Sequence, residues 1–425
     1  MKDSHCRFCM SNKIRIIIDF GNVALAGAFL TTEQFSKENK YPLQVCFCEN
    51  CFLVQIINHI PPQLLFKEYF YYSSAIATLR NHFNNYASDM YERFLKCINA
   101  TVVEIGCNDG VLLNPLSKLN IGKIIGVDPA TNIVQSINNP DVLIINDYFS
   151  ESIASKIENQ FGKADLIVAN NVYAHIDDIH DVTKGICNLL TKDGVFVFEV
   201  HYLGEILERL QYDMIYHEHI YYYSLIALDN YFNKYGMEIF DVKSIPIHAG
   251  SMRYYVRKKG TLPREDISQT VLDLRREELL KGFDKLETYL NYAYKVENTK
   301  NLLMHLLIEL KADNNRIWGY GASGRANTII QYCGIDKEII DFIVDDAPAK
   351  HGYYSPGSHF KIVPRSMLDD NPPDYILVFA WSFLNEVINK NMAYLMNGGK
   401  LIIPLPEVKI LSWKYNRIVE EIRYL

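Results

Sequence analysis

Residues 102–110 read Val102-Val103-Glu104-Ile105-Gly106-Cys107-Asn108-Asp109-Gly110, and residues 123–128 read Lys123-Ile124-Ile125-Gly126-Val127-Asp128. Each stretch is a short apolar run that ends in a polar turn, and the first turn contains two glycines. Glycines let a backbone approach a ligand closely, and an acid after the second strand accepts hydrogen bonds from ribose hydroxyls. The pattern therefore predicts a doubly wound sheet with a nucleoside pocket at Asp128.

The glycine-containing turn differs from that of a dinucleotide-binding fold. It reads E-x-G-x-x-x-G from Glu104 to Gly110, whereas dinucleotide folds use G-x-G-x-x-G. The carboxylate of Glu104 would repel a pyrophosphate and attract a cation. We therefore expect a cationic nucleoside cofactor, S-adenosylmethionine, at this turn. The candidate cofactor-binding residues are Glu104, Gly106, Asn108, Gly110, Asp128, Asn146, Asp147, Tyr148 and Asn170, with residues 146–148 at the adenine edge.

The alternation of predicted strands and helices divides the chain into three blocks. The central block places five strands between residues 101 and 200, followed by two apolar runs at Met237–Val242 and Ser251–Arg257. Seven strands that end in an antiparallel pair are a common arrangement in methyltransferases that use S-adenosylmethionine. The last block repeats a β–α–β pattern from Arg316 onward. The predicted domains are 1–68, 69–262 and 263–425.

Two cysteine pairs with metal-ligand spacing lie in the first block. Cys6-x2-Cys9 and Cys48-x2-Cys51 offer four thiolates, the ligand set of a tetrahedral zinc site. A closed four-sulfur site has no open position for a substrate, so this zinc would be structural. The predicted fold class is therefore α/β. It comprises a small N-terminal zinc-binding domain, a central seven-stranded Rossmann-like class I methyltransferase domain and a C-terminal Rossmann-like α/β domain.

Composition bounds the class of protein. The chain has 425 residues, of which 49% are hydrophobic and 22% charged, with a net charge of −7 at pH 7. Negative charge argues against a partner bound through its phosphates, such as a nucleic acid. No apolar run reaches the about 18 residues that span a bilayer, and the N-terminus lacks the apolar region of a signal peptide. We expect a cytoplasmic monomer that binds neither membrane nor nucleic acid.

Two polar clusters follow strands of the central block. Tyr216-His217-Glu218-His219 places two imidazoles beside a carboxylate, which supplies a base near neutral pH. Metal binding is the alternative, but H-E-H lacks the i, i+4 spacing of helical zinc sites. The second cluster, Asn170-Asn171-Val172-Tyr173-Ala174-His175, follows the fourth strand, at the carboxyl end where such sheets bind ligands.

A glycine-rich turn also opens the last block. Gly319-Tyr320-Gly321-Ala322-Ser323-Gly324-Arg325 separates a strand from a helix, and Val344-Asp345-Asp346 ends the next strand. Taken alone, this pattern is a dinucleotide fingerprint with a ribose acid. Amides at the helix N-terminus, together with Arg325, would equally suit a diphosphate. We favour a nucleotide diphosphate, with an NAD-dependent nucleotide-sugar oxidoreductase and a zinc-ribbon RNA methyltransferase as alternative functions.

Seven motifs in a fixed order carry a resemblance to a known family. They are the two cysteine pairs, Tyr71-Tyr72-Ser73-Ser74, the Glu104–Gly110 turn, Asn170–His175, Tyr216–His219, His248-Ala249-Gly250-Ser251-Met252-Arg253 and Gly319-Tyr320-Gly321-Ala322. With these motifs the chain resembles the nucleotide-sugar C-methyltransferases, including the enzyme type of tetronitrose biosynthesis, over essentially its whole length. It departs from the family at Ala249-Gly250, where Gly-Gly is common, and at Ser323-Gly324-Arg325, where Ala-Lys-Gly is common. These departures bear on substrate detail more than on reaction class.

The resemblance implies a reaction and a set of site residues. The reaction is methylation of carbon 3 of a dTDP-linked 4-keto-6-deoxy sugar, as in branched-chain deoxysugars of surface polysaccharides or natural products. Its catalytic residues would be His219 as the base, with Glu218, Tyr216, His175 and Tyr71. The implied substrate-binding residues are Tyr72, Ser73, Asn171, His217, Tyr222, Arg253, Gly321, Ser323 and Arg325. Whether Tyr71 or Tyr72 contacts the sugar is left open.

The chemistry of carbon methylation agrees with this interpretation. A C–H group beside a ketone is acidic enough to be deprotonated by a histidine, provided that a polar group holds the developing enolate oxygen. His219 is the candidate base, with Glu218 to orient it or raise its basicity. His175, Tyr216 and Tyr71 are the candidate donors to the enolate.

Overall fold

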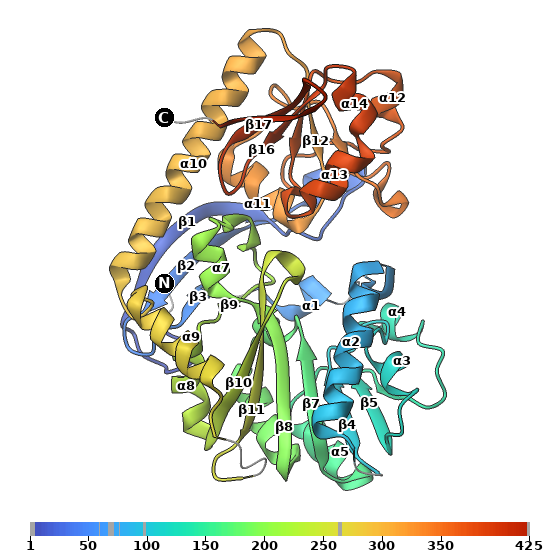
Figure 1. The fold of residues 1–425 in the computed structure, drawn as a ribbon, viewed down its shortest axis with the longest axis vertical. Coiled ribbons are helices and arrows are strands. Elements are labelled where there is room, and N and C mark those ends of the chain that lie inside the picture. The colour runs from blue at the N-terminus through green and yellow to red at the C-terminus, as the bar shows by residue number, and fades with distance from the viewer. Residues whose placement is uncertain are drawn as a thin grey trace.

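The computed structural model describes residues 5–58, 60–66, 72–75, 77–96, 99–261 and 266–422, and these residues contain three β-sheets. A four-stranded sheet lies between two seven-stranded sheets, one in the central part of the chain and one in the C-terminal part (Figure 1). The α/β architecture predicted from the sequence is confirmed.

The central sheet has the strand order β10-β11-β8-β7-β4-β5-β6. Five strands are parallel, and β11 joins β8 and β10 in antiparallel fashion, as predicted. The strands are β4 (Thr101–Ile105), β5 (Lys123–Val127), β6 (Leu143–Ile145), β7 (Ala164–Asn170), β8 (Leu190–His201), β10 (Met237–Ile245) and β11 (Ser251–Lys258). Their helices are α2 (Ala77–Phe94), α3 (Leu113–Leu116), α4 (Thr131–Val134), α5 (Glu151–Phe161), α6 (Ile179–Leu189), α7 (Leu203–Glu208) and α8 (Leu225–Phe232).

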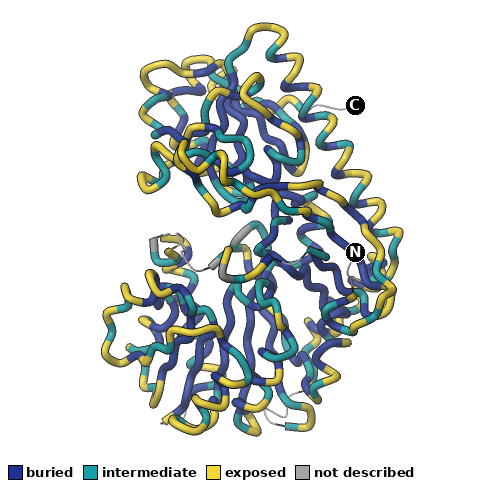
Figure 2. The backbone as a smooth tube through the Cα atoms, turned by 180° about the vertical axis from the view of Figure 1, so that it is seen from behind, coloured by how far each residue is buried: buried dark blue, intermediate teal, exposed yellow. Residues whose placement is uncertain are grey.

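Helices cover both faces of this sheet, which explains why its strands are apolar on both sides. Leu79, Phe83 and Met90 of α2 belong to one buried cluster, whereas α5 and α6 contribute to the cluster on the opposite face. Side-chain caps begin these two helices: Ser150 accepts a hydrogen bond from Ile153 N, and Asp178 caps α6. Buried backbone follows the strands of both large sheets (Figure 2).

The four-stranded antiparallel sheet combines two distant parts of the chain. Its N-terminal strands are β1 (Ile14–Ala24), β2 (Lys40–Cys48) and β3 (Val54–Ile56), and a short helix, α1 (Pro62–Phe66), follows them. Its fourth strand, β9 (Tyr221–Tyr222), comes from the histidine-rich segment of the central block. The N-terminal domain therefore supports the segment that carries the predicted base.

The C-terminal sheet has the order β14-β13-β12-β15-β16-β17-β18. Its strands are β12 (Ile317–Tyr320), β13 (Ile343–Val344), β14 (Ile362–Val363), β15 (Tyr375–Val378), β16 (Lys400–Ile403), β17 (Lys409–Lys414) and β18 (Arg417–Ile422). Its helices are α11 (Gly324–Cys333), α12 (Met367–Asp370), α13 (Leu384–Lys390) and α14 (Met392–Met396). The sequence predicted four of these strands but missed β14, which has two residues, and the antiparallel hairpin of β17 and β18.

The N-terminal and C-terminal domains are joined by polar contacts. Leu30 and Tyr354 form a β-bridge, and Glu38 accepts hydrogen bonds from Gly357 N and His359 Nε2, both at 2.8 Å. The side chain of Asn327 on α11 donates to the carbonyl of Ala24 at the end of β1, at 3.2 Å. These contacts hold the N-terminal sheet against the C-terminal domain.

Two helices connect the central and C-terminal domains: α9 (Gln269–Leu280) and α10 (Leu286–Ala312). The longer one, α10, runs along one side of the molecule past the four-stranded sheet (Figure 1). Among the described residues, no helix combines the length and the apolar character needed to cross a bilayer.

Glu278 on α9 is a wholly buried carboxylate that caps another helix. Its oxygens accept hydrogen bonds from Leu225 N at 2.8 Å and Ile226 N at 2.9 Å, in the first turn of α8, and from Tyr202 Oη at 3.0 Å. The amides of a first helical turn have no partner within their own helix. Glu278 therefore ties α9 to the central domain.

We expect Glu278→Ala to lower the free energy of unfolding markedly, because each buried amide left without an acceptor costs about 1–3 kcal/mol. Glu277→Ala is the matched control, since that side chain is 54% exposed and pairs with Lys281 at the surface. Urea denaturation of both variants measures the difference. Equal midpoints for the two variants would contradict the capping role.

Candidate functional site

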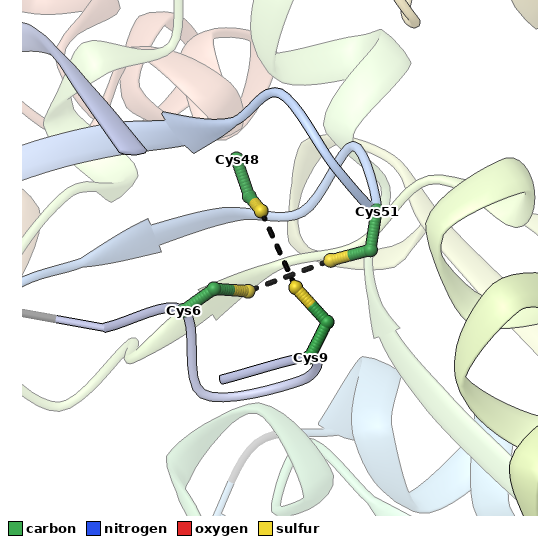
Figure 3. Close-up of side chains that lie close together, drawn as sticks. All are labelled: Cys6, Cys9, Cys48 and Cys51. Carbon is green, nitrogen blue, oxygen red and sulfur yellow. Dashed lines mark hydrogen bonds between the residues drawn. The ribbon is translucent and has the colours of Figure 1, made fainter. Parts of the chain in front are cut away.

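The four predicted zinc ligands come together in the N-terminal domain. The sulfurs of Cys6 and Cys51 are 3.4 Å apart and those of Cys9 and Cys48 are 3.5 Å apart. All four sulfurs lie within 4.8 Å of one another, and their side chains converge on one point (Figure 3). Zinc–sulfur bonds of about 2.3 Å in a tetrahedron separate the sulfurs by about 3.8 Å, so the cluster fits zinc.

The electrostatics of the cluster also call for a cation. Interaction with Cys48 raises the pKa of both Cys6 and Cys51, because thiolates crowd the same small volume. Four thiolates can coexist there when a divalent cation lies among them. Zinc thereby joins the segment before β1 to the turn between β2 and β3.

The turn after β4 requires glycine at Gly106. Its backbone has a φ of 70°, and its amide donates to the carbonyl of Val127 at 2.7 Å. A Cβ at this position would lie 2.2 Å from Cγ2 of Val172, so even alanine would clash. Gly110 and Asn108 also have positive φ values, of 76° and 48°. The turn therefore exposes backbone at the carboxyl end of the sheet, where such folds bind nucleosides.

Asp128 is held in place by two backbone amides. Its carboxylate accepts hydrogen bonds from Asn108 N at 2.9 Å and Ala130 N at 2.8 Å, and burial raises its pKa. Each carboxylate oxygen keeps a second lone pair that can accept from a ribose hydroxyl. Asn146 donates to the backbone carbonyl of Asp128 at 2.8 Å, and the neighbouring Tyr148 is 38% exposed. Asp147 lies between these two residues.

Several buried oxygen acceptors around the turn lack a donor within the described part of the chain. They are Oε2 of Glu104, Oδ1 of Asp109, Oδ1 of Asn170 and Oδ1 of Asn171. Burial raises the pKa of Glu104 well above its usual range, and its other oxygen receives a long hydrogen bond of 3.4 Å from Asn170. Unsatisfied buried acceptors are costly, and a cationic donor relieves them. These oxygen acceptors fit the ammonium group of S-adenosylmethionine, which donates hydrogen bonds.

A short segment before α2 lies against the cofactor turn. Ser73 N donates to Oδ1 of Asn108 and Ser74 N donates to Oδ2 of Asp109, both at 3.0 Å. Tyr72 precedes them and is 40% exposed. The structure thus brings Ser73 to the turn, whereas Tyr71 lies outside the described residues.

His219 lies in a cluster of aromatic and imidazole rings. Its ring centroid is 4.1 Å from that of Tyr216, 4.8 Å from that of His201 and 5.0 Å from that of His175. Nδ1 of His219 is 2.7 Å from the carbonyl oxygen of Met214. A carbonyl only accepts, so Nδ1 carries the proton and Nε2 of the neutral ring is the basic nitrogen.

A backbone group orients His219, because its Nδ1 bonds to the Met214 carbonyl. Glu218 was expected to orient His219 or to raise its basicity, and that role stays a prediction. Oε1 of Glu218 lies 3.4 Å from the Cβ position of Gly27 in the N-terminal domain. Backbone carbonyls leave no signal in a sequence, so Met214 could not have been identified from it. His201 was also missed, because it ends a strand with no motif around it.

Three of the predicted catalytic side chains are only partly buried. His175, Tyr216 and Glu218 keep part of their surface open to solvent. Burial by surrounding protein nevertheless lowers the pKa of His175 to about 4 and raises the pKa of Glu218 to about 7. Burial also raises the pKa of Tyr216 well above its usual range. His175 is therefore neutral at pH 7, and the Tyr216 hydroxyl keeps its proton. Asn171 follows β7 and is likewise half-buried.

Three predicted substrate-binding residues have structural contacts elsewhere. Nε2 of His217 bonds to the carbonyl of Pro42 at 3.1 Å. Tyr222 is buried in β9 and lines a small internal cavity with tyrosines of α10. Arg253 is buried, 2.9 Å from Oε2 of Glu199, with its guanidinium over a ring of α2. The Tyr222 side chain also lies near Tyr216. The substrate roles of all three residues stay predictions.

The C-terminal glycine-rich turn lies next to Tyr216 and to the N-terminal domain. The Cβ position of Gly324 is 3.3 Å from Ala26 and 3.5 Å from the Tyr216 ring. Gly321 has a φ of 97°, and Ser323 caps α11 by accepting from Ala326 N at 3.3 Å. The turns of both large domains therefore lie beside the histidine-rich segment.

Arg325 joins the two large domains through a carboxylate. Its Nε donates to Asp213 at 2.8 Å, and Trp381 Nε1 donates to the same oxygen at 2.8 Å. Its Nη1 donates to Ser382 at 3.0 Å, whereas its buried Nη2 has no acceptor among the described residues. The Nη2 amino group of Arg325, with two N–H bonds, thus remains as a donor for an anion. The pairing with Asp213 was missed, since the two residues are far apart in the chain.

The C-terminal domain repeats the acid geometry of the central one. Asp345 accepts from Ala322 N at 2.8 Å and Ala347 N at 2.9 Å, as Asp128 accepts from two amides. Here, however, Nζ of Lys350 lies 3.2 Å from the Asp345 carboxylate. A ribose would compete with this lysine for the acid.

Purified protein should contain about one zinc per chain, because four thiolates complete one coordination shell. We expect Cys48→Ser to lose the metal and to unfold at a lower temperature. Cys187→Ser is the matched control, since Cys187 lies outside the cluster. Elemental analysis of the three proteins provides the measurement, and full zinc content in the Cys48 variant would refute the site.

Asp128→Ala should weaken S-adenosylmethionine binding, since each hydrogen bond to a charged acceptor contributes about 1.5–3 kcal/mol. Glu104→Gln should also weaken it, because an amide cannot ionise to pair with the cofactor's ammonium. Asp141→Ala, an exposed acid in the loop before β6, should bind like the wild type. Isothermal calorimetry compares the three, and unchanged affinity at Asp128 would place the pocket elsewhere.

All three parts of the chain match models of known protein families. Residues 6–66 match a family model described as "Putative zinc binding domain", residues 79–242 match a methyltransferase domain, and residues 246–406 match a C-methyltransferase C-terminal domain. These limits lie near the predicted domain boundaries, which remain predictions. The chain is also 31% identical to the C-methyltransferase NovU of Streptomyces niveus, over 96% of each protein.

Solved structures resemble a part of the chain. The YcgJ protein of Bacillus subtilis shares 15% identity over 42% of this chain and 100% of its own, with a TM-score of 0.32. Magnesium protoporphyrin IX methyltransferase of Synechocystis shares 12% identity over 42% of this chain and 83% of its own, with a TM-score of 0.33. Likenesses at these scores carry no argument about function. On its match to NovU, the chain belongs to the C-methyltransferases, enzymes that use S-adenosylmethionine and carry an N-terminal zinc-binding domain.

Proposed function

We propose that this enzyme methylates carbon 3 of a nucleotide-linked 4-keto-6-deoxy sugar, with dTDP as the nucleotide. The product would be a branched-chain deoxysugar of a surface polysaccharide or a natural product. The observation that carries the proposal is the hydrogen bond of His219 Nδ1 to the carbonyl of Met214, at 2.7 Å. This hydrogen bond makes Nε2 the basic nitrogen of His219, within the cluster formed by the rings of Tyr216, His175 and His201.

Carbon becomes a nucleophile when the proton beside the ketone is removed. In the proposed reaction, Nε2 of His219 takes this proton, and the electron pair moves to the carbonyl oxygen. Bound S-adenosylmethionine supplies the methyl group, which is electrophilic because it is attached to a positively charged sulfur. The substrate carbon must lie in line with the methyl group and the sulfur, and the base must reach the proton on that carbon, so positioning supplies much of the rate enhancement.

The enolate oxygen needs hydrogen-bond donors. His175 is neutral at pH 7, with a pKa of about 4, and offers one N–H group. The hydroxyl of Tyr216 keeps its proton because burial raises its pKa well above the usual range. Both rings contact that of His219, so they are the proposed donors. Tyr71, the third candidate, lies outside the described residues.

The nucleotide diphosphate is proposed to lie at the N-terminus of α11. Arg325 supports this placement, because its Nη2 has no acceptor in the described part of the structure. Backbone amides at a helix N-terminus add partial positive charge. The turn at Gly324 also lies beside Tyr216, so a sugar attached to the diphosphate would lie near the ring of Tyr216.

One contact disfavours the alternative of an NAD-dependent oxidoreductase. A dinucleotide would need the Asp345 carboxylate for its ribose, but Lys350 already pairs with that acid at 3.2 Å. Asp128 in the central domain is paired with backbone amides and keeps its acceptor capacity. The nucleoside pocket of the central domain is therefore the better ligand site.

His219→Ala should abolish methylation while leaving the affinities for cofactor and nucleotide sugar near wild type. Proton removal can be measured separately from methyl transfer when S-adenosylhomocysteine replaces the methyl donor. The measurement is the exchange with D₂O of the proton beside the ketone. We expect the variant to lose this exchange, because general base catalysis contributes on the order of 10²–10⁴-fold. Wild-type exchange in the variant would exclude His219 as the base. His305→Ala, a histidine that is 71% exposed on α10, is the matched control.

A further inference from the structure

Carbon methylation by the proposed route leaves a proton on the enzyme at every turnover. The C–H bond of the substrate breaks, an N–H bond forms on His219, and the methyl group moves from sulfur to carbon. The sulfur then becomes neutral, so one proton must reach solvent before the next cycle. This inference rests on the proposed function, in which His219 is the base.

The surroundings of His219 restrict how that proton can leave. Its Nδ1–H points at the carbonyl of Met214, at 2.7 Å, and an amide carbonyl is too weak a base to accept a proton. The same Nε2 that receives the proton must therefore pass it on. His219 is 4% exposed, so a neighbouring group is better placed than bulk water to receive it.

Three rings of the described structure contact the ring of His219, and they differ as proton acceptors. The hydroxyl of Tyr216 already carries its proton, because burial raises its pKa well above the usual range. His175 is a poor acceptor, since burial lowers its pKa to about 4. The third ring is that of His201, with its centroid 4.8 Å away and its plane inclined by 45°.

The position of His201 suits a transfer to solvent. It is the last residue of β8 and is paired with Ser251 of β11, so its backbone is fixed in the sheet. Its side chain is half-buried, whereas that of His219 is almost wholly enclosed. The following residue, Tyr202, donates its amide to the carbonyl of Gly250 at 3.3 Å, which extends the same pairing. An imidazole on a backbone fixed in the sheet, with part of its surface open to solvent, therefore lies beside the enclosed His219.

We propose that His201 receives the proton from Nε2 of His219 after each methyl transfer and delivers it to solvent. In this step the N–H bond of His219 breaks, an N–H bond forms on a ring nitrogen of His201, and water accepts a proton from the ring of His201. Two imidazoles have similar intrinsic basicity, so the transfer between them needs little driving force. The step requires no oxidant, metal or further reactant. His201 acts through His219 and is not assigned a contact with the substrate.

The test compares single-turnover with steady-state methylation in His201→Ala. With enzyme in excess, the first turnover uses a His219 that is already deprotonated, so its rate should stay within about twofold of wild type. Steady-state kcat should fall on the order of 10-fold or more, the lower range of proton-transfer effects. Free imidazole in the buffer should restore kcat, because it replaces the lost acceptor. His305→Ala on α10 should behave like wild type in every assay.

The outcomes separate this proposal from the one on which it rests. Equal losses in single-turnover and steady-state rates, without rescue by imidazole, would mean a structural role for His201 and overturn the relay. Unchanged steady-state kcat would overturn it as well. If instead His219→Ala still exchanges the substrate proton in the presence of S-adenosylhomocysteine, the base assignment itself fails. A nucleotide sugar and S-adenosylmethionine, supplied to the full-length zinc-loaded protein, serve as substrates throughout.

Discussion

The pairing of β9 with β3 is the contact on which the active region depends. Through it, the segment that follows His219, the proposed base, becomes the outer strand of a sheet built by the N-terminal domain. The C-terminal domain holds the same segment from another side, since Thr328 donates to the carbonyl of Ile215 at 2.9 Å and Arg325 pairs with Asp213. A base in a loop needs such support, because catalytic geometry tolerates errors of well under an ångström.

Local patterns made much of this arrangement predictable. Three features could be recognised from a few neighbouring residues, because a turn, a strand end and a metal knuckle are short-range structures. They are the turn at Glu104–Gly110, the acid Asp128 and the four cysteines. Contacts between distant segments were not predictable. They depend on tertiary packing, which the hydrophobic periodicity of a sequence does not reveal. Examples are the pairing of Arg253 with Glu199, the carbonyl that orients His219 and the two-residue strand β9.

The two Rossmann-like domains share one backbone arrangement around an acid, but only one of them leaves that acid available to a ligand. In each, an acid after the second strand of the motif is clamped by two amides, and a glycine amide bonds to the end of that strand at 2.7 Å. In the central domain the acid remains available to a ligand. In the C-terminal domain Lys350 pairs with it, which turns a ligand site into a structural contact. A shared fold thus does not imply a shared ligand, because a single side chain such as Lys350 determines whether the acid can bind one.

The cysteine cluster also has a consequence for the cell. Cys48 ends β2, Cys51 lies just before β3, and β3 pairs with the strand next to the base. A closed four-sulfur zinc site has no open position for a substrate, yet β3, which pairs with the strand just after His219, is anchored to the metal-bound turn. Growth on scarce zinc should therefore lower C-methyltransferase activity even where methyl donor and substrate are plentiful.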